Sequence, residues 1–219
     1  MSDDRPTVLL LHDEGRSADQ WRDFVPVLEA RFRVLAPDLP RDAGTAIDLV
    51  RAALGGDRCG VIGHGTGGSL AQVLAAEGGV DAMVLLDAPR AEDLDDGVLA
   101  SFDFPVLLLW GEDDAEVPVS VAEELNDVIA TSTLGLLPGC GHDLTDQAAV
   151  TIAPMILEYL RARYLKLPHS QAHAHTGDPD HAHDGVVRIQ LERRPPWIDL
   201  EEDERDDWFV EDDDDEAAP

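Results

Sequence analysis

Short, continuous apolar runs alternate with amphipathic stretches from residue 7 to about residue 165, and this alternation restricts the fold more than any other feature. The runs have the length of strands, but they lack the alternate polar residues of a strand with one face in water. Strands that are apolar on both faces are typical of parallel sheets covered by helices on both sides. Six strands are expected, at 7–11, 32–36, 59–62, 82–86, 105–110 and 133–137.

The stretches between these runs carry apolar residues at helical spacing. In residues 17–30, for example, one helical face would hold Trp21, Phe24, Val25 and Leu28. Helices are expected at 17–30, 45–54, 67–76, 119–129 and 148–164. The sequence therefore predicts a three-layer, doubly wound α/β domain whose sheet is mostly parallel and has about six strands.

The chain is strongly acidic: 46 aspartate and glutamate residues stand against 16 lysine and arginine residues, and the formal net charge is −30. A field of this sign repels nucleic acid and anionic membrane surfaces, so neither is expected as a partner. Lys166 is the only lysine. This composition suits a halophile, because a cytoplasm of high salt screens the self-repulsion. A GC-rich genome combined with an acidic tail explains it equally well.

No apolar segment approaches the roughly 18 residues of a membrane-spanning helix. The first residues are polar and run straight into the first expected strand, without the basic and apolar regions of a secretory signal. We therefore expect a cytoplasmic protein without membrane insertion. The two cysteines, Cys59 and Cys140, do not form a disulfide framework and are interpreted as small buried side chains.

The strand at 59–62 leads into the turn Gly63-His64-Gly65-Thr66-Gly67-Gly68 and then into a helix. A turn this sharp needs a positive φ at its centre and little bulk beside it, which accounts for the glycines. The strand–turn–helix segment resembles the nucleophile elbow, G-x-S-x-G, of the α/β-hydrolase superfamily. Gly65 occupies the position at which that family carries its catalytic serine.

Four further segments resemble the family in its own order and spacing, so that the resemblance covers about residues 7–165. They are Leu10-Leu11-His12, similar to the segment that shapes the oxyanion site; Trp21 with 34–38, similar to the helix and strand that follow it; 110–118, similar to the loop carrying the acid; and 138–142, similar to the loop carrying the catalytic histidine. Only residues 87–104 separate the strands between which many members insert a helical cap. The resemblance therefore implies a capless α/β-hydrolase-like domain with a shallow pocket.

By the same resemblance, Asp114 matches the acid of the catalytic triad and His142 matches its base, with Asp113 as the alternative for the acid. In an active member the acid orients the histidine and the histidine deprotonates the serine, while two backbone N–H groups bind the developing oxyanion. Gly65 has no side-chain oxygen and cannot form an acyl-enzyme.

Three residues fall in the region that binds the oxyanion in the family: His12, Asp13 and Thr66. Asp13 stands where the family usually has glycine. A carboxylate at this place repels the negative charge that the site should stabilise. Together with Gly65, this second departure predicts a loss of hydrolysis.

Three functional hypotheses follow from these residues. The first is a pseudoenzyme derived from a hydrolase, in which Asp114 and His142 are relics and the chain acts as a binding or assembly subunit. The second is an enzyme, either a residual hydrolase or esterase, or a catalyst that uses the His142–Asp114 pair as a base without a covalent step. The third is metal binding by the C-terminal tail. No cofactor is expected in the domain itself.

The character of the sequence changes after residue 167, which divides the chain into a domain, 1–167, and a C-terminal tail, 168–219. Five of the eight histidines lie between residues 169 and 185, without a core residue among them. Alternate histidines of an extended chain can chelate zinc or nickel, although a soluble linker is the plainer interpretation. The candidate ligands are His173, His175, His181 and His183.

Apolar side chains return further along the tail. Residues 186–191 alternate apolar and polar, which predicts an edge strand that joins either the chain's own sheet or that of a partner. Trp197, Trp208 and Phe209 are embedded in an acidic segment that should be mostly disordered when alone. Aromatic residues in such segments are typical interface anchors, so we expect the tail to contact a protein partner. The alternative is that the tail folds back onto its own domain.

Overall fold

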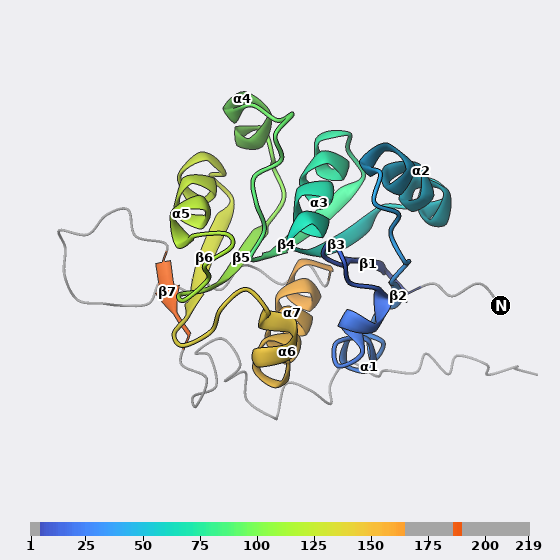
Figure 1. The fold of residues 1–219 in the computed structure, drawn as a ribbon. Helices are drawn as coiled ribbons and strands as arrows, with labels where there is room; N and C mark the ends of the chain where they lie inside the picture. The colour runs from blue at the N-terminus through green and yellow to red at the C-terminus, as the bar shows by residue number, and fades with distance from the viewer. Residues whose placement is uncertain (1–4, 165–185, 190–219) are drawn as a thin grey trace, which may run out of the picture.

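A computed structural model describes residues 5–164 and 186–189 of the chain (Figure 1). In these residues seven strands form one parallel sheet, in the order β2-β1-β3-β4-β5-β6-β7. The strands are β1 (Thr7–Leu11), β2 (Arg33–Leu35), β3 (Cys59–His64), β4 (Val80–Leu86), β5 (Val106–Gly111), β6 (Ser132–Leu137) and β7 (Val186–Arg188). The predicted parallel sheet is confirmed, and to its six expected strands β7 adds the edge strand that was predicted within residues 186–191.

Helices cover both faces of the sheet (Figure 1). One face carries α2 (Ala43–Leu54), α3 (Thr66–Ala76), α4 (Asp96–Ala100) and α5 (Val119–Val128), and the other carries α1 (Val25–Leu28), α6 (Leu144–Gln147) and α7 (Ala149–Tyr164). A short 3₁₀ helix, η1 (Ala18–Trp21), contacts β1 and α6. The three-layer, doubly wound architecture is therefore confirmed. None of the described helices is both long and apolar enough to cross a membrane.

Residues 17–30, expected as one helix, form η1 and α1 instead. Pro26 explains the break, because proline lacks an N–H group and is accepted only in the first turn of a helix, so α1 begins at Val25. The apolar face predicted here is still buried: Trp21 and Phe24 are fully buried and pack edge to face, with 5.3 Å between ring centroids.

The strands are buried on both faces because alternate residues enter two separate cores. In β1, Val8 and Leu10 belong to the core that includes α1 and α7, whereas Leu9 and Leu11 belong to the core that includes α2 and α3. All four side chains are fully buried. Burial of an aliphatic side chain of this size contributes about 1.5–3 kcal/mol, so each strand stabilises both halves of the fold.

The seventh strand comes from the predicted tail. β7 pairs with β6 in parallel, with Val186 opposite Leu134, and the N–H group of Ile189 donates to the carbonyl oxygen of Leu136 at 2.8 Å. Ile189 is buried in the core that includes α7. The sheet therefore draws on residues beyond the division at residue 167. Of the two hosts considered for this strand, the chain's own sheet is the one observed.

The start of α3 approaches the end of β1 so closely that glycine is required between them. A Cβ atom at Gly67 would lie 2.5 Å from the carbonyl oxygen of His12 and closer still to that of Leu11. A Cβ atom at Gly63 would collide with the backbone of Gly67 and Gly68. This close approach brings the loop after β1 next to the turn that follows β3.

We expect Gly67→Ala to lower the free energy of unfolding by about 1–3 kcal/mol, because its methyl group has no space between α3 and β1. Gly44→Ala in α2 is the matched control, since its new Cβ atom would meet nothing nearer than 3.6 Å. An alanine in a helix is more stable than a glycine by about 0.5–1 kcal/mol. Chemical denaturation of both variants measures the difference, and equal stabilities would contradict the close approach.

Candidate active site

The turn after β3 is tight, and hydrogen bonds hold it to the end of β4 and to the start of α3. Gly65 has φ 52° and ψ −125°, a conformation that residues with a side chain rarely adopt. Its N–H group donates to the carbonyl oxygen of Leu86 at the end of β4, at 3.0 Å, and its carbonyl oxygen accepts from Gly68 at 2.9 Å. Gly65 is thereby fixed at the carboxyl edge of the sheet, where α3 begins.

The carboxylate of Asp13 occupies the space next to Gly65 that a side chain would need. A Cβ atom at Gly65 would lie 2.9 Å from Oδ2 of Asp13 and closer still to Cγ and Oδ1. Oδ1 accepts hydrogen bonds from the N–H group of Thr66 at 2.8 Å and from its hydroxyl at 2.9 Å. The first amide of α3, which is a natural donor to an oxyanion, is therefore already bound to a carboxylate of the same chain.

The loop after β1 holds Asp13 in this position through its own hydrogen bonds. The N–H group of Asp13 donates to Oε1 of Gln20 at 3.1 Å. Nε2 of His12 accepts from the N–H group of Leu39 at 2.8 Å, so the ring proton is on Nδ1, which donates to the carbonyl oxygen of Asp13 at 2.8 Å. His12, predicted as part of an oxyanion region, is a buried residue that supports the loop through both ring nitrogens.

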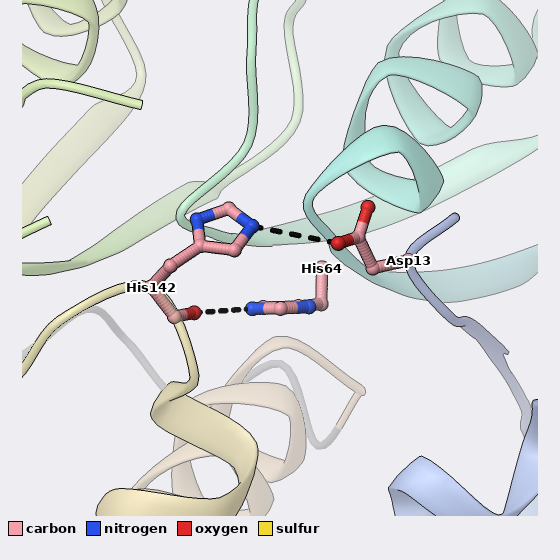
Figure 2. Close-up of side chains that lie close together, drawn as sticks. All are labelled: Asp13, His64 and His142. Carbon is pink, nitrogen blue, oxygen red and sulfur yellow. Dashed lines mark hydrogen bonds and ion pairs between the residues drawn. The ribbon is translucent and has the colours of Figure 1, made fainter. Parts of the chain in front are cut away.

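His142 lies between two carboxylates. Its Nδ1 is 2.9 Å from Oδ2 of Asp114. Its Nε2 is 3.4 Å from Oδ2 of Asp13 (Figure 2). The acid that contacts Nδ1 of His142 is therefore Asp114 and not the alternative, Asp113. The backbone N–H group of Asp113 donates to the carbonyl oxygen of Cys140 at 2.9 Å. The structure thus brings together Asp114 and His142, and it adds Asp13, which lies next to Gly65, on the other side of the imidazole.

This arrangement favours a protonated imidazole that faces the ionised carboxylate of Asp13. The interaction with Asp13, and then that with Asp114, raise the pKa of His142 to about 9, against the opposing effect of burial. Burial alone would raise the pKa of Asp13, but the donors from His142, Thr66 and Glu14 outweigh it and hold that pKa well below its usual value. At neutral pH the imidazolium has no free lone pair with which to accept a proton.

Two buried ionisable residues lie behind this pair, and neither was singled out from the sequence. Nε2 of His64 donates to the carbonyl oxygen of His142 at 2.6 Å, and burial lowers the pKa of His64 (Figure 2). Asp87 directly follows β4 and has φ 46°, and burial raises its pKa to about 8. Within the described residues, Nδ1 of His64 and Oδ2 of Asp87 are buried without a hydrogen-bond partner. In the sequence, His64 and Asp87 could have been identified as candidate site residues from their position at the carboxyl ends of parallel strands.

A cleft of about 650 Å³ opens beside Asp13. It is bounded by the loops after β1, β2 and β4 and by the first half of α3, and Asp13 and Thr66 line it. Neither His142 nor Asp114 is among the lining residues. The cleft has the size of a small-molecule site, but Asp13 stands between it and the imidazole.

Two relatives share part of the sequence. The magnesium-chelatase 30 kDa subunit of Rhodobacter capsulatus is 35% identical over 119 residues, which are 48% of this chain and 41% of the relative. A soluble epoxide hydrolase of Corynebacterium sp. strain C12 is 33% identical over 119 residues, 47% of this chain and 40% of the relative. The matches span about two fifths of the length of each relative. No family model matches the sequence.

Solved structures agree over most of the chain. A CIB-like hydrolase of Thermoplasma acidophilum matches with a TM-score of 0.66 and 22% identity, over 74% of this chain and 89% of that chain. The meta-cleavage product hydrolase of Pseudomonas fluorescens IP01 also gives 0.66, at 18% identity over 71% and 90%. The chain has the α/β-hydrolase fold. The strand–turn–helix segment predicted around Gly65 is observed between β3 and α3.

The remaining predicted site residues lie outside the described residues. They are the candidate partner anchors Trp197, Trp208 and Phe209 and the candidate metal ligands His173, His175, His181 and His183.

We expect Asp13→Asn to move the pKa of His142 from about 9 toward its ordinary value of 6.5, because the first of its two carboxylate partners loses its charge. Imidazole NMR over a pH series measures the midpoint. Asp113→Asn is the matched control and should leave the midpoint near 9, since its carboxyl does not contact the ring. A midpoint that is the same in wild type and Asp13→Asn would contradict the imidazolium between two carboxylates.

The same interaction makes stability depend on pH. Because the pKa of His142 is raised from 6.5 to about 9, its contribution is fully present below pH 6.5 and is lost as the pH rises through 9. The stability advantage of wild type over Asp13→Asn should therefore shrink between these two pH values. Urea denaturation at a series of pH values checks this, and an advantage that grows over that range would contradict it.

Proposed function

We propose that this chain is an α/β-hydrolase-fold protein without serine-type hydrolysis, which acts as a binding or assembly subunit and contacts a protein partner through its C-terminal arm. The observation that carries the proposal is the Asp13 carboxylate, which fills the space next to Gly65 where the nucleophile's side chain would lie. A substrate carbonyl cannot occupy the same place.

Three parts of the hydrolytic mechanism are affected at once. The nucleophile is missing at Gly65, and the amide of Thr66 donates to Asp13 in place of an oxyanion. His142 faces Asp13 as an imidazolium, which cannot act as a general base. Asp13 accounts for the second and third parts and Gly65 for the first, so the proposed loss depends on two residues together.

A subunit role has support from one relative. The Rhodobacter capsulatus protein is named as a subunit of a magnesium chelatase, and so as one component of a larger enzyme. In this chain the arm that follows Ile189 begins at the carboxyl end of β7, the same edge of the sheet as Gly65 and His142. Its aromatic residues Trp197 and Trp208 would supply the apolar anchors that a protein interface needs.

The enzyme hypothesis keeps two supporting observations. Asp114 and His142 are in contact, and one relative is named a soluble epoxide hydrolase. Against it, His142 is bound on both ring nitrogens and does not line the cleft. Activity measurements distinguish the two hypotheses.

With a panel of activated esters, we expect no turnover by wild type or by Gly65→Ser, because a serine at residue 65 collides with Asp13. The double variant Gly65→Ser with Asp13→Gly frees the amide of Thr66 and the ring of His142. Its rate should exceed that of Gly65→Ser by at least about 100-fold, the usual value of an oxyanion donor. Turnover by wild type that disappears in His142→Ala would refute the proposal.

For the partner, we compare complexes captured from native lysate with the full chain and with a variant in which Trp197, Trp208 and Phe209 are serine. We expect the variant to lose the main partner, because the proposed apolar anchors are removed. Replacement of His173 and His175 by alanine is the control and should retain the partner. If the full chain and both variants captured the same set of proteins, the C-terminal arm would have no part in the proposed function.

A further inference from the structure

The cleft beside Asp13 crosses four strands of the sheet. Its lining residues come from the loops after β2, β1 and β4 and from the start of α3, which follows β3. These strands are neighbours, in the order β2-β1-β3-β4. Neighbouring strands lie about 4.8 Å apart, so the loops after β2 and after β4 bound the cleft at two ends that are about 14 Å apart. The cleft therefore has the length of a short extended chain segment.

The two ends of the cleft carry opposite charges. Arg41 lines the end after β2, and Glu92 and Asp93 line the end after β4. All three are exposed, and among the described residues their side chains have no ion pair or hydrogen bond. The other arginines of the cleft, Arg16 and Arg90, are already paired with aspartates. One basic end and one acidic end are therefore left to bind an occupant.

The lining between these two ends is mainly apolar. It includes Leu39 on the loop after β2, Ala46 of α2, and Leu70 and Val73 of α3. Glu14 on the loop after β1 adds a further acidic side chain. A chain segment that suits this cleft has basic residues at one end, apolar residues in the middle and an acidic residue at the other end.

The C-terminal arm contains a segment with this order of residues. Residues 193–199 read Arg-Arg-Pro-Pro-Trp-Ile-Asp, with two basic residues first, then Trp197 and Ile198, and then Asp199. The five steps from Arg194 to Asp199 span about 16 Å in an extended chain, close to the length of the cleft. The two prolines favour an extended conformation before docking, which lowers the entropy lost on binding.

The arm approaches the cleft from the side that this order requires. It begins after Ile189, at the carboxyl end of β7, and β7 lies three strands from β4 in the sheet (Figure 1). That separation is about 14 Å, and residues 190–194 span up to about 17 Å when extended. An arm that continues in this direction meets the acidic end of the cleft first and Arg41 last, which is the order of its own basic and acidic residues.

Charge also limits docking to this part of the arm. Residues 200–219 hold 12 acidic residues and one arginine, and the whole chain has a formal net charge of −30. The acidic domain therefore repels this last part of the arm. Trp208 and Phe209 lie within it, so they stay available to a partner.

We propose that residues 193–199 of the C-terminal arm dock in the cleft of their own chain. The two arginines face the acidic end, Trp197 packs on the apolar lining, and Asp199 pairs with Arg41. The docked arm closes the cleft beside Asp13 to other ligands. This contact goes beyond the proposed subunit role and does not rest on it. A partner that binds Trp197 must first displace it from the cleft.

The test uses the purified full chain with Trp208→Phe as the background. Trp21 and Trp110 are fully buried, so quenching of tryptophan fluorescence by acrylamide reports on Trp197. A synthetic peptide of residues 190–202 gives the value for a free arm. We expect Trp197 to be at least about 3-fold less quenched in the full chain, because a pocket of this kind buries about 70–90% of the surface of its ligand.

Charge reversal tests where the arm lies. Arg41→Glu should weaken docking by about 5-fold and raise the quenching of Trp197, because an ion pair becomes a repulsion. Adding Asp199→Arg to Arg41→Glu should restore the protection. Arg31→Glu makes the same change of charge at an exposed residue outside the cleft and should have no effect. The measurements are made at low salt, since salt screens exposed charges.

Circular dichroism shows that each variant is folded. The proposal is overturned if Trp197 is quenched as strongly in the full chain as in the peptide. It is also overturned if folded Arg41→Glu behaves like Arg31→Glu, or if Asp199→Arg does not restore protection. Protection that disappears on dilution would assign the docked arm to a second copy and overturn docking within one chain. None of these measurements involves a partner, so their outcome is separate from that of the capture experiment.

Discussion

The carboxylate of Asp13 contacts the start of α3 and His142 at the same time, and most features of the carboxyl edge depend on this position. A partly buried carboxylate is stable only with donors on both oxygens, and here Thr66 and His142 supply them. Asp114 then holds the far side of the imidazole. Arg16 adds an ion pair to Asp146 at 3.2 Å, which joins the loop after β1 to α6. The Asp13 carboxylate contacts His142, which contacts Asp114, and these contacts link the loops after β1, β6 and β5.

The fold could be predicted because burial on both faces of a strand leaves a local record in the sequence, as in β1, and because the turn at Gly65 is local as well. The role of Asp13 is not local. It depends on contact with Thr66, which lies 53 residues away, and on an approach of α3 to β1 that only glycine at residue 67 allows. The burial of Asp87 depends in the same way on packing between elements. The sequence did not predict which sheet the strand at 186–188 joins, because an alternating pattern shows which face of a strand is buried but not which strand lies beside it.

Buried ionisable groups destabilise a fold unless they are paired, and apolar residues of similar volume would stabilise it more. This chain keeps Asp87 and His64 fully buried, each with an unsatisfied atom among the described residues, directly behind His142. A scaffold that served only to present a surface would gain stability from replacing them. Both residues therefore lower the stability of the fold at the carboxyl edge of the sheet, which also carries Gly65 and His142.

The short strand β7 lies at the end of the sheet and is bonded along β6 (Figure 1). Residues 165–185 separate it from α7 in sequence, so its pairing with β6 is a long-range contact. If β7 left its place, the N–H and C=O groups of β6 would become an open edge, and open edges invite pairing with another copy of the chain. Changes that weaken β7 should therefore appear first as self-association in concentrated samples, before any change at the carboxyl edge itself.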